Sequence, residues 1–376
     1  MFHTYILWLL ASSAHAVLIS PPTGPYAVSM SAQTLTDTSR TDPYAPSNSS
    51  HARQVMISTF LPVDAPCSAR ERVAYMTPLV AQAYDQLAAA VGLPNDTFSS
   101  LEMEFCKTKT RVCRRRTRGS KFPLVLFSPG WGNPRLLYGA MAREVASRGF
   151  AVVTIDHPYD PSYVEFPDGT VYTAVEMDTD DTTQLEMLTK VRAQDTSFVL
   201  SHLSDNPLAG IDLSRTIMFG HSLGGATAAA AMLTDTRILG GIDFDGKLLS
   251  PVLEEGLDRP FALVGRPGHA EDDPTWDQFY SALRGRKADL SVDGTTHASF
   301  TDFPTLIASL NVSLSETSEA LLRAELGTLE FGRGAEVVAG IVEGFAELVH
   351  DNRTGPMFTE DGDASYPEVS VLRASI

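Results

Sequence analysis

Residues 217–226 read Ile-Met-Phe-Gly-His-Ser-Leu-Gly-Gly-Ala, and this stretch decides the fold. An apolar, strand-forming run enters the stretch, and an alanine-rich run leaves it. The motif is G-x-S-x-G, and it stands between a strand and a helix, where such a motif presents a nucleophilic serine. Glycine is needed at 220 and 224 because the turn is too tight for side chains there. We therefore expect Ser222 to lie clear of the sheet, beside the positive end of the following helix.

Length and composition limit the classes of function. The chain has 376 residues, a hydrophobic fraction of 43%, a formal net charge of −17 and a pI near 4.9. Such a chain can bury a large core, and one α/β domain accounts for its length. A strongly acidic surface repels phosphates, so nucleic acid is excluded as a partner. The composition suits an extracellular protein.

The first sixteen residues have the pattern of a signal peptide. A short apolar core spans residues 5–11, and Ala14-His15-Ala16 supplies small residues at the cleavage site. We expect cleavage after Ala16. The apolar core is too short to span a bilayer, and no later segment reaches that length. The protein is therefore predicted to be secreted and to lack a transmembrane segment.

Cysteines and glycosylation sequons agree with that route. Cys67, Cys106 and Cys113 allow one disulfide and one free thiol. We favour Cys67–Cys106 because it closes the longer loop, but a Cys106–Cys113 bridge remains an alternative. The sequence holds four N-x-S/T candidates for N-glycosylation, at Asn48, Asn95, Asn311 and Asn352.

The chain divides into a catalytic domain and flanking segments. Residues 17–50 are rich in Pro, Ser and Thr and are predicted to be extended and loose, and residues 351–376 to form a loose tail. Residues 51–350 should form a single domain. Residues 107–121 are strongly basic, with three arginines at 114–116. A solvated loop is the preferred interpretation, with a processing site or a contact for anionic lipid headgroups as alternatives.

Strand-like and helix-like segments alternate from residue 122 onward. This alternation predicts an open, mostly parallel sheet with helices on both faces, which with the serine motif is the α/β-hydrolase fold. The expected strands are 54–62, 122–128, 151–155, 216–219, 241–245, 261–265 and 288–292, and the expected helices are 79–91, 136–148, 182–203, the stretch after Ser222, 321–326 and 337–350.

A serine nucleophile needs a histidine base, which in this fold follows the serine in the chain. His297 lies in a glycine-containing loop after the last expected strand, where a mobile base belongs. His269 follows a strand too closely, and His350 ends a surface-type helix. His221 lies within the serine motif itself and points away from the nucleophile. His297 is therefore the predicted base.

The carboxylate that orients the base is less well defined by position. Asp245 lies at the end of the strand after the alanine-rich helix, next to Gly246, where a turn can present it to His297. Asp243 lies earlier on the same strand and should be buried. Asp245 is preferred, and Asp243 stays open as an alternative. Three aspartates rank lower: Asp258, Asp272 and Asp273.

An oxyanion hole requires two backbone N–H groups, one from the residue after the nucleophile and one from the loop after the first core strand. Leu223 supplies the first. Trp131, in the loop Pro-Gly-Trp-Gly at 129–132, is the expected second donor. The remaining His and Cys residues lack the spacing of metal ligands, and neither a metal nor a cofactor is predicted.

Several stretches resemble the platelet-activating-factor acetylhydrolase family, specifically its secreted, plasma-type group and fungal relatives. The resemblance runs from about residue 120 to about residue 305. The stretches that carry it are 127–132, 137–138, 146–150, 220–227, Gly-Ile-Asp-Phe-Asp at 241–245 and Thr-His-Ala-Ser-Phe-Thr-Asp-Phe at 296–303.

The resemblance implies a function. It implies that Asp245 is the triad acid, together with Ser222 and His297. It also implies a calcium-independent serine esterase acting on short or oxidised sn-2 acyl chains of phospholipids, with lipid aggregates as a further expected partner. The family loop often reads His-Gly-Leu-Gly, so the indole of Trp131 is expected to reshape the acyl pocket. The alternatives are a general carboxylesterase, including a polyester or cutin-type hydrolase, and a catalytically inactive hydrolase fold used for binding.

Overall fold

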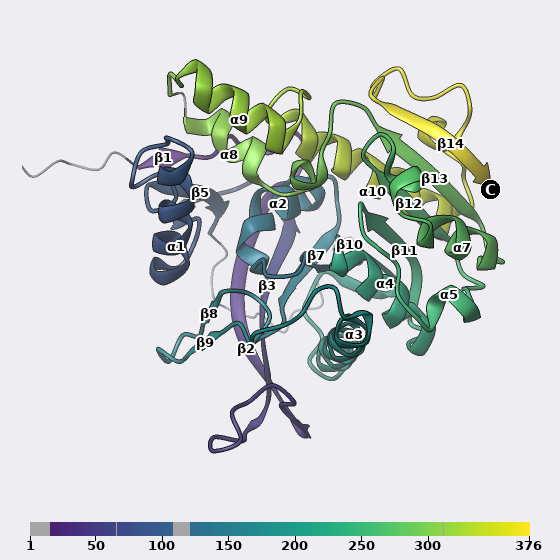
Figure 1. Ribbon diagram of the computed structural model, residues 1–376, viewed down its shortest axis with the longest axis horizontal. Coiled ribbons are helices and arrows are strands. Elements are labelled where there is room, and N and C mark those ends of the chain that lie inside the picture. Colours follow the sequence, from purple (N-terminus) through teal and green to yellow (C-terminus); the bar gives the residue numbers. More distant parts are fainter. Residues whose placement is uncertain (1–15, 65, 108–120, 311) are drawn as a thin grey trace, which may run out of the picture.

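A nine-stranded sheet forms the centre of the computed structural model, which describes residues 16–64, 66–107, 121–310 and 312–376 (Figure 1). Its strand order is β14-β13-β12-β11-β10-β6-β7-β3-β2. The strands are β2 (Ala27–Thr41), β3 (Ala52–Val63), β6 (Phe122–Ser128), β7 (Ala151–Asp156), β10 (Ile211–His221), β11 (Ile238–Phe244), β12 (Phe261–Gly265), β13 (Lys287–Val292) and β14 (Val369–Ser375).

The inner strands of this sheet are parallel, whereas β2, β3 and β14 at its edges are antiparallel. Parallel strands are covered on both faces, which explains why β7 and β12 are buried along their whole length. Pairing aligns Gly220 of β10 with Ser128 of β6 on one side and with Asp243 of β11 on the other. The loops that follow these three strands therefore meet at the carboxyl edge of the sheet.

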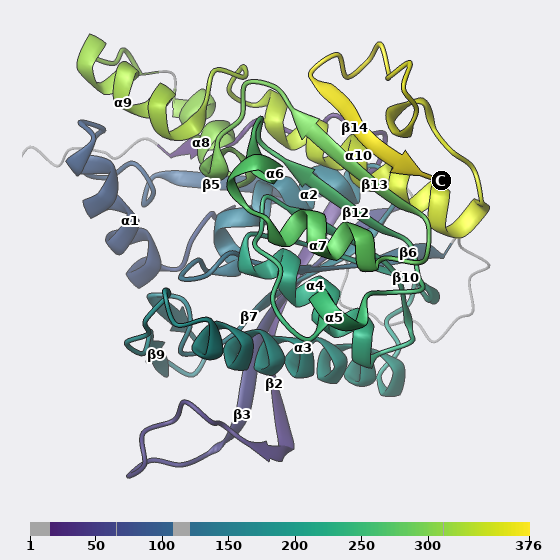
Figure 2. The same cartoon turned by 45° about the vertical axis from the view of Figure 1, so that its right-hand side comes forward.

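Helices cover both faces of the sheet (Figures 1 and 2). Helices α2 and α10 pack on one face with the β6 side chains Val125 and Phe127. Helices α3, α4 and α7 pack on the other with Leu124 and Leu126. The helices are α1 (Pro78–Ala90), α2 (Gly139–Ser147), α3 (Thr182–Asp205), α4 (Leu223–Thr234), α5 (Val252–Glu255), α6 (His269–Asp272), α7 (Thr275–Ala282), α8 (Phe303–Leu310), α9 (Glu316–Leu326) and α10 (Arg333–Asp351), with 3₁₀ turns η1 (Arg135–Tyr138), η2 (His297–Phe300) and η3 (Pro356–Phe358). The predicted fold class is confirmed.

Two boundary predictions are wrong. The segment predicted to be extended and loose at 17–50 is extended but not loose, because it contains β2, a 15-residue strand paired with β3 along most of its length. Its Ser- and Thr-rich sequence hid the strand, because only one face of an edge strand is apolar. The tail predicted to be loose at 351–376 contains β14, which pairs with β13. The sheet therefore extends beyond the 51–350 domain at both ends.

A smaller sheet lies beside α1 and consists of β1 (Val17–Leu18), β5 (Leu101–Cys106) and β4 (Arg70–Ala74). A disulfide joins Cys67 to Cys106, with 5.6 Å between their Cα atoms. This is the pairing that we predicted because it closes the longer loop. Cys113, the arginines at 114–116 and the candidate Asn311 lie outside the described residues. A short hairpin, β8 (Tyr163–Glu165) with β9 (Val171–Thr173), completes the strands.

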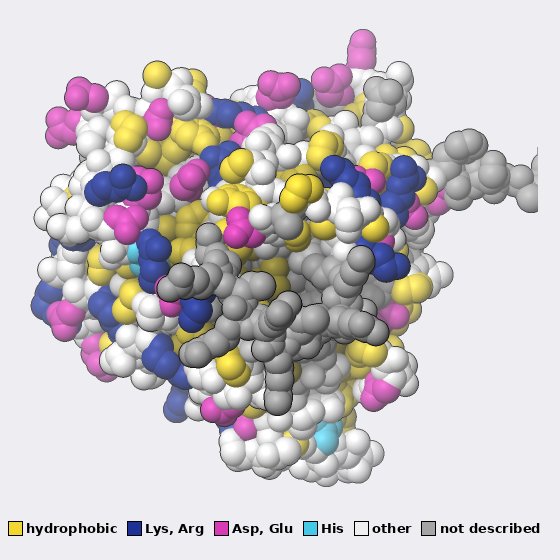
Figure 3. Space-filling view, turned by 180° about the vertical axis from the view of Figure 1, so that it is seen from behind, with side chains coloured by type: hydrophobic (Ala, Val, Ile, Leu, Met, Phe, Trp, Pro, Cys, Tyr) yellow, Lys and Arg dark blue, Asp and Glu magenta, His cyan; other side chains and the backbone are white. Residues whose placement is uncertain are grey.

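Figure 3 shows the molecule from the side opposite to the view of Figure 1, and charged side chains of both signs are interspersed over the described part of this face. A mixture of this kind produces a weaker local field than a surface of one sign. Among the helices in the described ranges, none combines the length and apolar character needed to cross a bilayer.

Candidate active site

Ser222 lies at the sharp turn between β10 and α4. Its backbone has φ of +55° and ψ of −126°, a conformation that costs free energy for any residue other than glycine. A Cβ on Gly220 would lie 2.1 Å from the backbone of Gly224, and a Cβ on Gly224 would lie 1.9 Å from the carbonyl oxygen of Ser128. Both glycines of the motif are therefore required by close backbone approach, as the sequence predicts.

The predicted oxyanion loop packs directly against this turn. Residues 129–132 follow β6, and the Trp131 side chain is 42% exposed. The backbone N–H groups of Trp131 and Leu223 donate no hydrogen bond to any part of the chain that the structure describes. Leu223 directly follows Ser222, so its free N–H group lies at the positive end of α4.

Asp245 follows β11 in a left-handed turn, with φ of +58°. Its Oδ2 atom is 2.7 Å from Nδ1 of His297, and its Oδ1 atom is 2.8 Å from Nδ1 of His269 and accepts the Arg266 backbone N–H at 2.9 Å. Burial alone would raise the pKa of Asp245. The hydrogen bonds from His269 and His297 outweigh that effect and hold its pKa well below the usual value. Asp245 is therefore ionised at neutral pH.

His297 begins the 3₁₀ turn η2, directly after the loop that follows β13. Its side chain is 52% exposed, although its partner Asp245 is buried. Hydroxyl and backbone groups of Thr296 and Ser299 form a reciprocal capping box that fixes this turn. The structure thus brings the predicted base against the predicted acid and leaves its ring accessible from solvent.

Asp243, the alternative acid, lies beneath the turn. It is fully buried, its Oδ1 accepts the Gly246 N–H at 3.1 Å, and a Cβ on Gly225 would collide with it. Burial raises the pKa of Asp243 well above its usual value and so favours its protonated form. Its described hydrogen bond goes to backbone and not to either histidine. The lower-ranked Asp258 and Asp272 form surface ion pairs with arginines.

His221 connects the loops around the site. Its Nε2–H donates to the carbonyl oxygen of His297 at 2.9 Å, and its Nδ1 accepts from Tyr138 Oη at 2.9 Å. Tyr138 in turn accepts the Gly130 N–H at 3.1 Å. Burial, and the nearby His297, lower the pKa of His221 to about 3, so the ring is neutral. It points away from Ser222 and ties the base loop to the oxyanion loop.

Two residues of the site escaped the sequence analysis. His269 was rejected as the base because it follows its strand closely, yet its ring packs at a tilt of 35° against Trp276, with 4.1 Å between centroids, and forms a hydrogen bond with Asp245. Arg192 lies in the middle of α3, and its guanidinium reaches the oxyanion loop. A basic residue in a long helix gave no sequence signal of a role at the site.

We predict a pH-dependent contribution of His269 to stability. Burial lowers the pKa of His269, but the hydrogen bond to Asp245 and the carboxylate of Asp273, 3.8 Å away, raise it to about 9. Its folded pKa exceeds the unfolded value of about 6.5, so the stabilisation is complete below about pH 6.5 and disappears as the pH rises through 9. The pKa difference corresponds to about 3 kcal/mol.

Urea unfolding at pH 6 and pH 9.5 measures this contribution. The wild-type protein should lose more unfolding free energy between these pH values than His269→Gln does, since the shared titrations of other groups cancel in the comparison. Equal losses in the two proteins would contradict the ion pair between His269 and Asp245.

Comparison with protein families gives a match that covers more than half of the chain. The family described as "Platelet-activating factor acetylhydrolase, isoform II" matches residues 82–166 and 176–317. A probable 1-alkyl-2-acetylglycerophosphocholine esterase from Arthroderma benhamiae is 30% identical, over 97% of this chain and 96% of its own length. Platelet-activating factor acetylhydrolase from Cavia porcellus is 27% identical, over 49% of each chain.

A solved structure is similar over nearly the whole molecule. The ferulic acid esterase of Streptomyces cinnamoneus is 27% identical and superposes with a TM-score of 0.76, covering 95% of this chain and 100% of its own.

Proposed function

Since the chain belongs to the platelet-activating factor acetylhydrolase family and is a serine carboxylic-ester hydrolase, we propose that Ser222, His297 and Asp245 form its catalytic triad. The observation that carries the proposal is the 2.7 Å contact between His297 Nδ1 and Asp245 Oδ2, beside the strained serine turn. Trp131 and Leu223 provide the oxyanion donors.

The proposed reaction follows from these positions. His297 Nε2 takes the proton of Ser222 as its oxygen attacks the acyl carbon, and the N–H groups of Trp131 and Leu223 stabilise the oxyanion. The imidazolium then gives the proton to the leaving alcohol, and the acyl-enzyme remains. Water, activated by the same base, hydrolyses the acyl-enzyme. Asp245 stays ionised throughout and holds Nδ1–H of His297.

No hydrogen bond joins Ser222 to His297 in the described ranges, and the mechanism requires this contact only once substrate is bound. Substrate-free enzymes of this kind often hold the contact loosely. The exposed ring of His297 leaves the room for such an adjustment.

The proposed substrates are short-chain acyl esters, with sn-2 acetyl and short-chain phospholipids first among them. The activity that names the Arthroderma relative, which matches almost end to end, supports this choice. Lipid aggregates are a proposed source of such phospholipids.

A second candidate is a broader carboxylesterase that accepts bulky or polymeric esters. The similarity of the whole fold to a ferulic acid esterase favours it. A binding protein without activity is disfavoured, since the contact between Asp245 and His297 that catalysis needs is present.

Two measurements test the proposal. A fluorophosphonate should label Ser222 covalently, and labelling of another residue would contradict the assignment. Hydrolysis of p-nitrophenyl esters of graded chain length should be compared with that of an sn-2 acetyl phospholipid. A maximum at acetyl and a preference for the phospholipid are expected, whereas a maximum at long or aromatic acyl groups would favour the second candidate.

We also propose that the protein is secreted after loss of residues 1–16 and is glycosylated. Asn48, Asn95 and Asn352 are exposed, and the Cys67–Cys106 disulfide suits an oxidising compartment. Mass spectrometry of protein from the culture medium should find a mature chain beginning at Val17 and glycans at these asparagines. A chain beginning at Met1 would contradict the proposal.

A further inference from the structure

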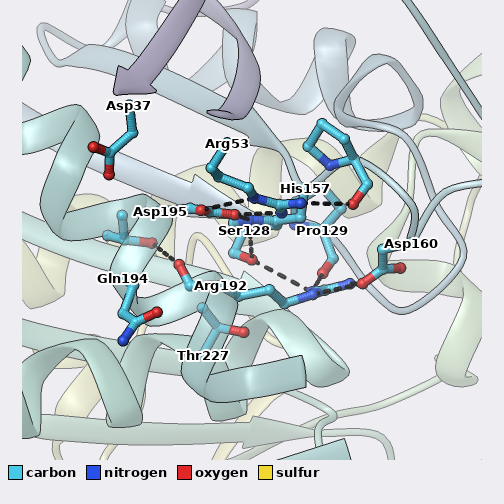
Figure 4. A network of polar contacts seen from close by, with 12 residues as sticks. Asp37, Arg53, Ser128, Pro129, His157, Asp160, Arg192, Gln194, Asp195 and Thr227 are labelled. Atoms are coloured by element: carbon cyan, nitrogen blue, oxygen red, sulfur yellow. Dashed lines mark hydrogen bonds and ion pairs between the residues drawn. The ribbon is translucent and has the colours of Figure 1, made fainter. Parts of the chain in front are cut away.

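A buried polar network lies directly beneath the oxyanion loop (Figure 4). Its centre is Arg192, which extends from α3 and is only 1% exposed. Arg192 pairs with Asp160, to which its Nε donates at 2.7 Å. A guanidinium removed from water needs a partner for each of its donors, and the network supplies them.

Two of these partners are backbone carbonyls of the oxyanion loop. Nη1 of Arg192 donates to the carbonyl oxygen of Pro129 at 2.6 Å, and Nη2 lies 3.4 Å from that of Gly130. The Gly130 oxygen also accepts the Asn133 N–H at 3.2 Å. The planar fork of one arginine therefore holds two successive carbonyls of the loop.

This arrangement determines where the next N–H group points. In a trans peptide the C=O and the following N–H are antiparallel, so a Gly130 carbonyl directed at Arg192 directs the Trp131 N–H the opposite way. That N–H has no acceptor in the described part of the protein. It is the same group that the proposed mechanism uses at the oxyanion.

Asp160 fixes the other end of the loop. Its Oδ1 accepts the Gly132 N–H at 2.8 Å, while its Oδ2 pairs with Arg192. Gly132 has φ of +75°, a conformation that glycine adopts readily. One ion pair thus holds the peptide units on both sides of Trp131.

A second set of hydrogen-bonded Ser, His and Asp side chains is connected to this network. Ser128 Oγ is 3.0 Å from Nε2 of His157, and Nδ1 of His157 is 2.9 Å from Oδ2 of Asp195. These three side chains are almost completely inaccessible, so no ester can reach Ser128. Burial, the largest influence, lowers the pKa of His157, and its neutral ring accepts from Ser128 and donates to Asp195.

Asp195 connects these three side chains to the β2–β3 hairpin. It accepts from Arg53 at 2.7 Å and from Arg40 at 2.8 Å. Ser128 Oγ in turn lies 3.5 Å from Nη1 of Arg192. The network therefore runs from the hairpin to the oxyanion loop without a break, as Figure 4 shows for Arg53, His157 and Arg192.

We propose that Arg192 is a positioning residue of the oxyanion hole, which fixes the Gly130 carbonyl and so aims the Trp131 N–H at the acyl oxygen. This inference rests on the proposed function. Arg192 does not touch substrate, and it acts through the peptide unit between Gly130 and Trp131.

The test uses the full chain with Arg192→Lys, which retains the charge but loses the planar fork. Substrates are p-nitrophenyl acetate and its thionoester, whose sulfur accepts hydrogen bonds poorly. Because an oxyanion donor acts mainly in the transition state, kcat for the oxyester should fall about 100-fold with KM changed less than about threefold. The thionoester should lose less than about tenfold, so the rate ratio between the two esters should collapse.

Arg259→Lys is the matched control. Arg259 also donates to backbone carbonyls, among them that of Asp235 at 2.9 Å, but at the other end of α4, about 18 Å along the helix from Ser222. It should leave the oxyester to thionoester ratio at the wild-type value. Equal loss on both esters in Arg192→Lys, or the same change of ratio in both variants, would overturn the inference.

Asp160→Asn provides a second route if Arg192→Lys does not fold. Its amide oxygen still accepts the Gly132 N–H, but the ion pair is lost, so the ratio should change in the same direction. An unchanged ratio in a folded variant would overturn the inference. Wild-type protein that neither hydrolyses either ester nor reacts with a fluorophosphonate at Ser222 would instead contradict the proposed function.

Discussion

Replacement of Ser222 by alanine is expected to lower kcat/KM for ester hydrolysis by about 10⁵- to 10⁶-fold, because no other side chain of the site can form the acyl-enzyme. The fold should survive. The serine side chain is partly exposed, and alanine differs from serine only by the hydroxyl at a backbone conformation that strains both residues alike. Steady-state kinetics together with thermal unfolding measures both effects.

The activity that remains in Ser222→Ala tests whether Ser222 is the nucleophile. A folded Ser222→Ala protein that retains more than about one part in a thousand of the wild-type rate would place the nucleophile elsewhere. The variant should also lose all reaction with a fluorophosphonate. Persistent labelling would identify the true nucleophile by peptide mapping.

Asp245→Asn is expected to lower kcat by about 10⁴-fold. Asp245 accepts three hydrogen bonds, from His297, His269 and the Arg266 backbone, and the amide of asparagine can accept through only one of its two terminal atoms. Its NH₂ group would face Nδ1 of His297 or of His269. In the first case the imidazole of His297 is held in the wrong tautomer to accept the proton of Ser222.

Asp243→Asn is the matched control, two positions away. Since burial favours the protonated form of Asp243, asparagine matches the shape and charge of that form, and the amide oxygen still accepts the Gly246 N–H. Activity should stay within about threefold of wild type. Equal losses in the two folded variants, or a larger loss in Asp243→Asn, would show that the acid is assigned wrongly.

The sequence was sufficient to predict the inner part of the fold. Buried parallel strands such as β7 and β12 are continuous apolar runs, and the glycines of the serine motif mark the turn directly. Edge strands lack this signal. β2 alternates weakly and is rich in Ser and Thr, so its pairing with β3 depends on a partner that local sequence does not reveal.

The sequence allows candidate site residues to be chosen where chain order and motif restrict the choice, as for the proposed Ser222 and His297. The site was not predictable where the fold brings distant positions together. His269 reaches Asp245 only because its ring packs at a tilt against Trp276, and Arg192 reaches the oxyanion loop only because α3 packs beside α4 on the same face of the sheet. Such contacts depend on tertiary packing, which neither spacing nor periodicity encodes.

The positions of β2 and β14 at opposite edges of the sheet bear on how the protein is synthesised. Residues 27–41 leave the ribosome early, yet the other edge is closed only when residues 369–375 have emerged. Until then the nascent chain presents β13 with unpaired backbone groups, to which another extended segment can add. Closure of the sheet is therefore a late event in biogenesis, and the interval before it is when the chain most needs protection by chaperones.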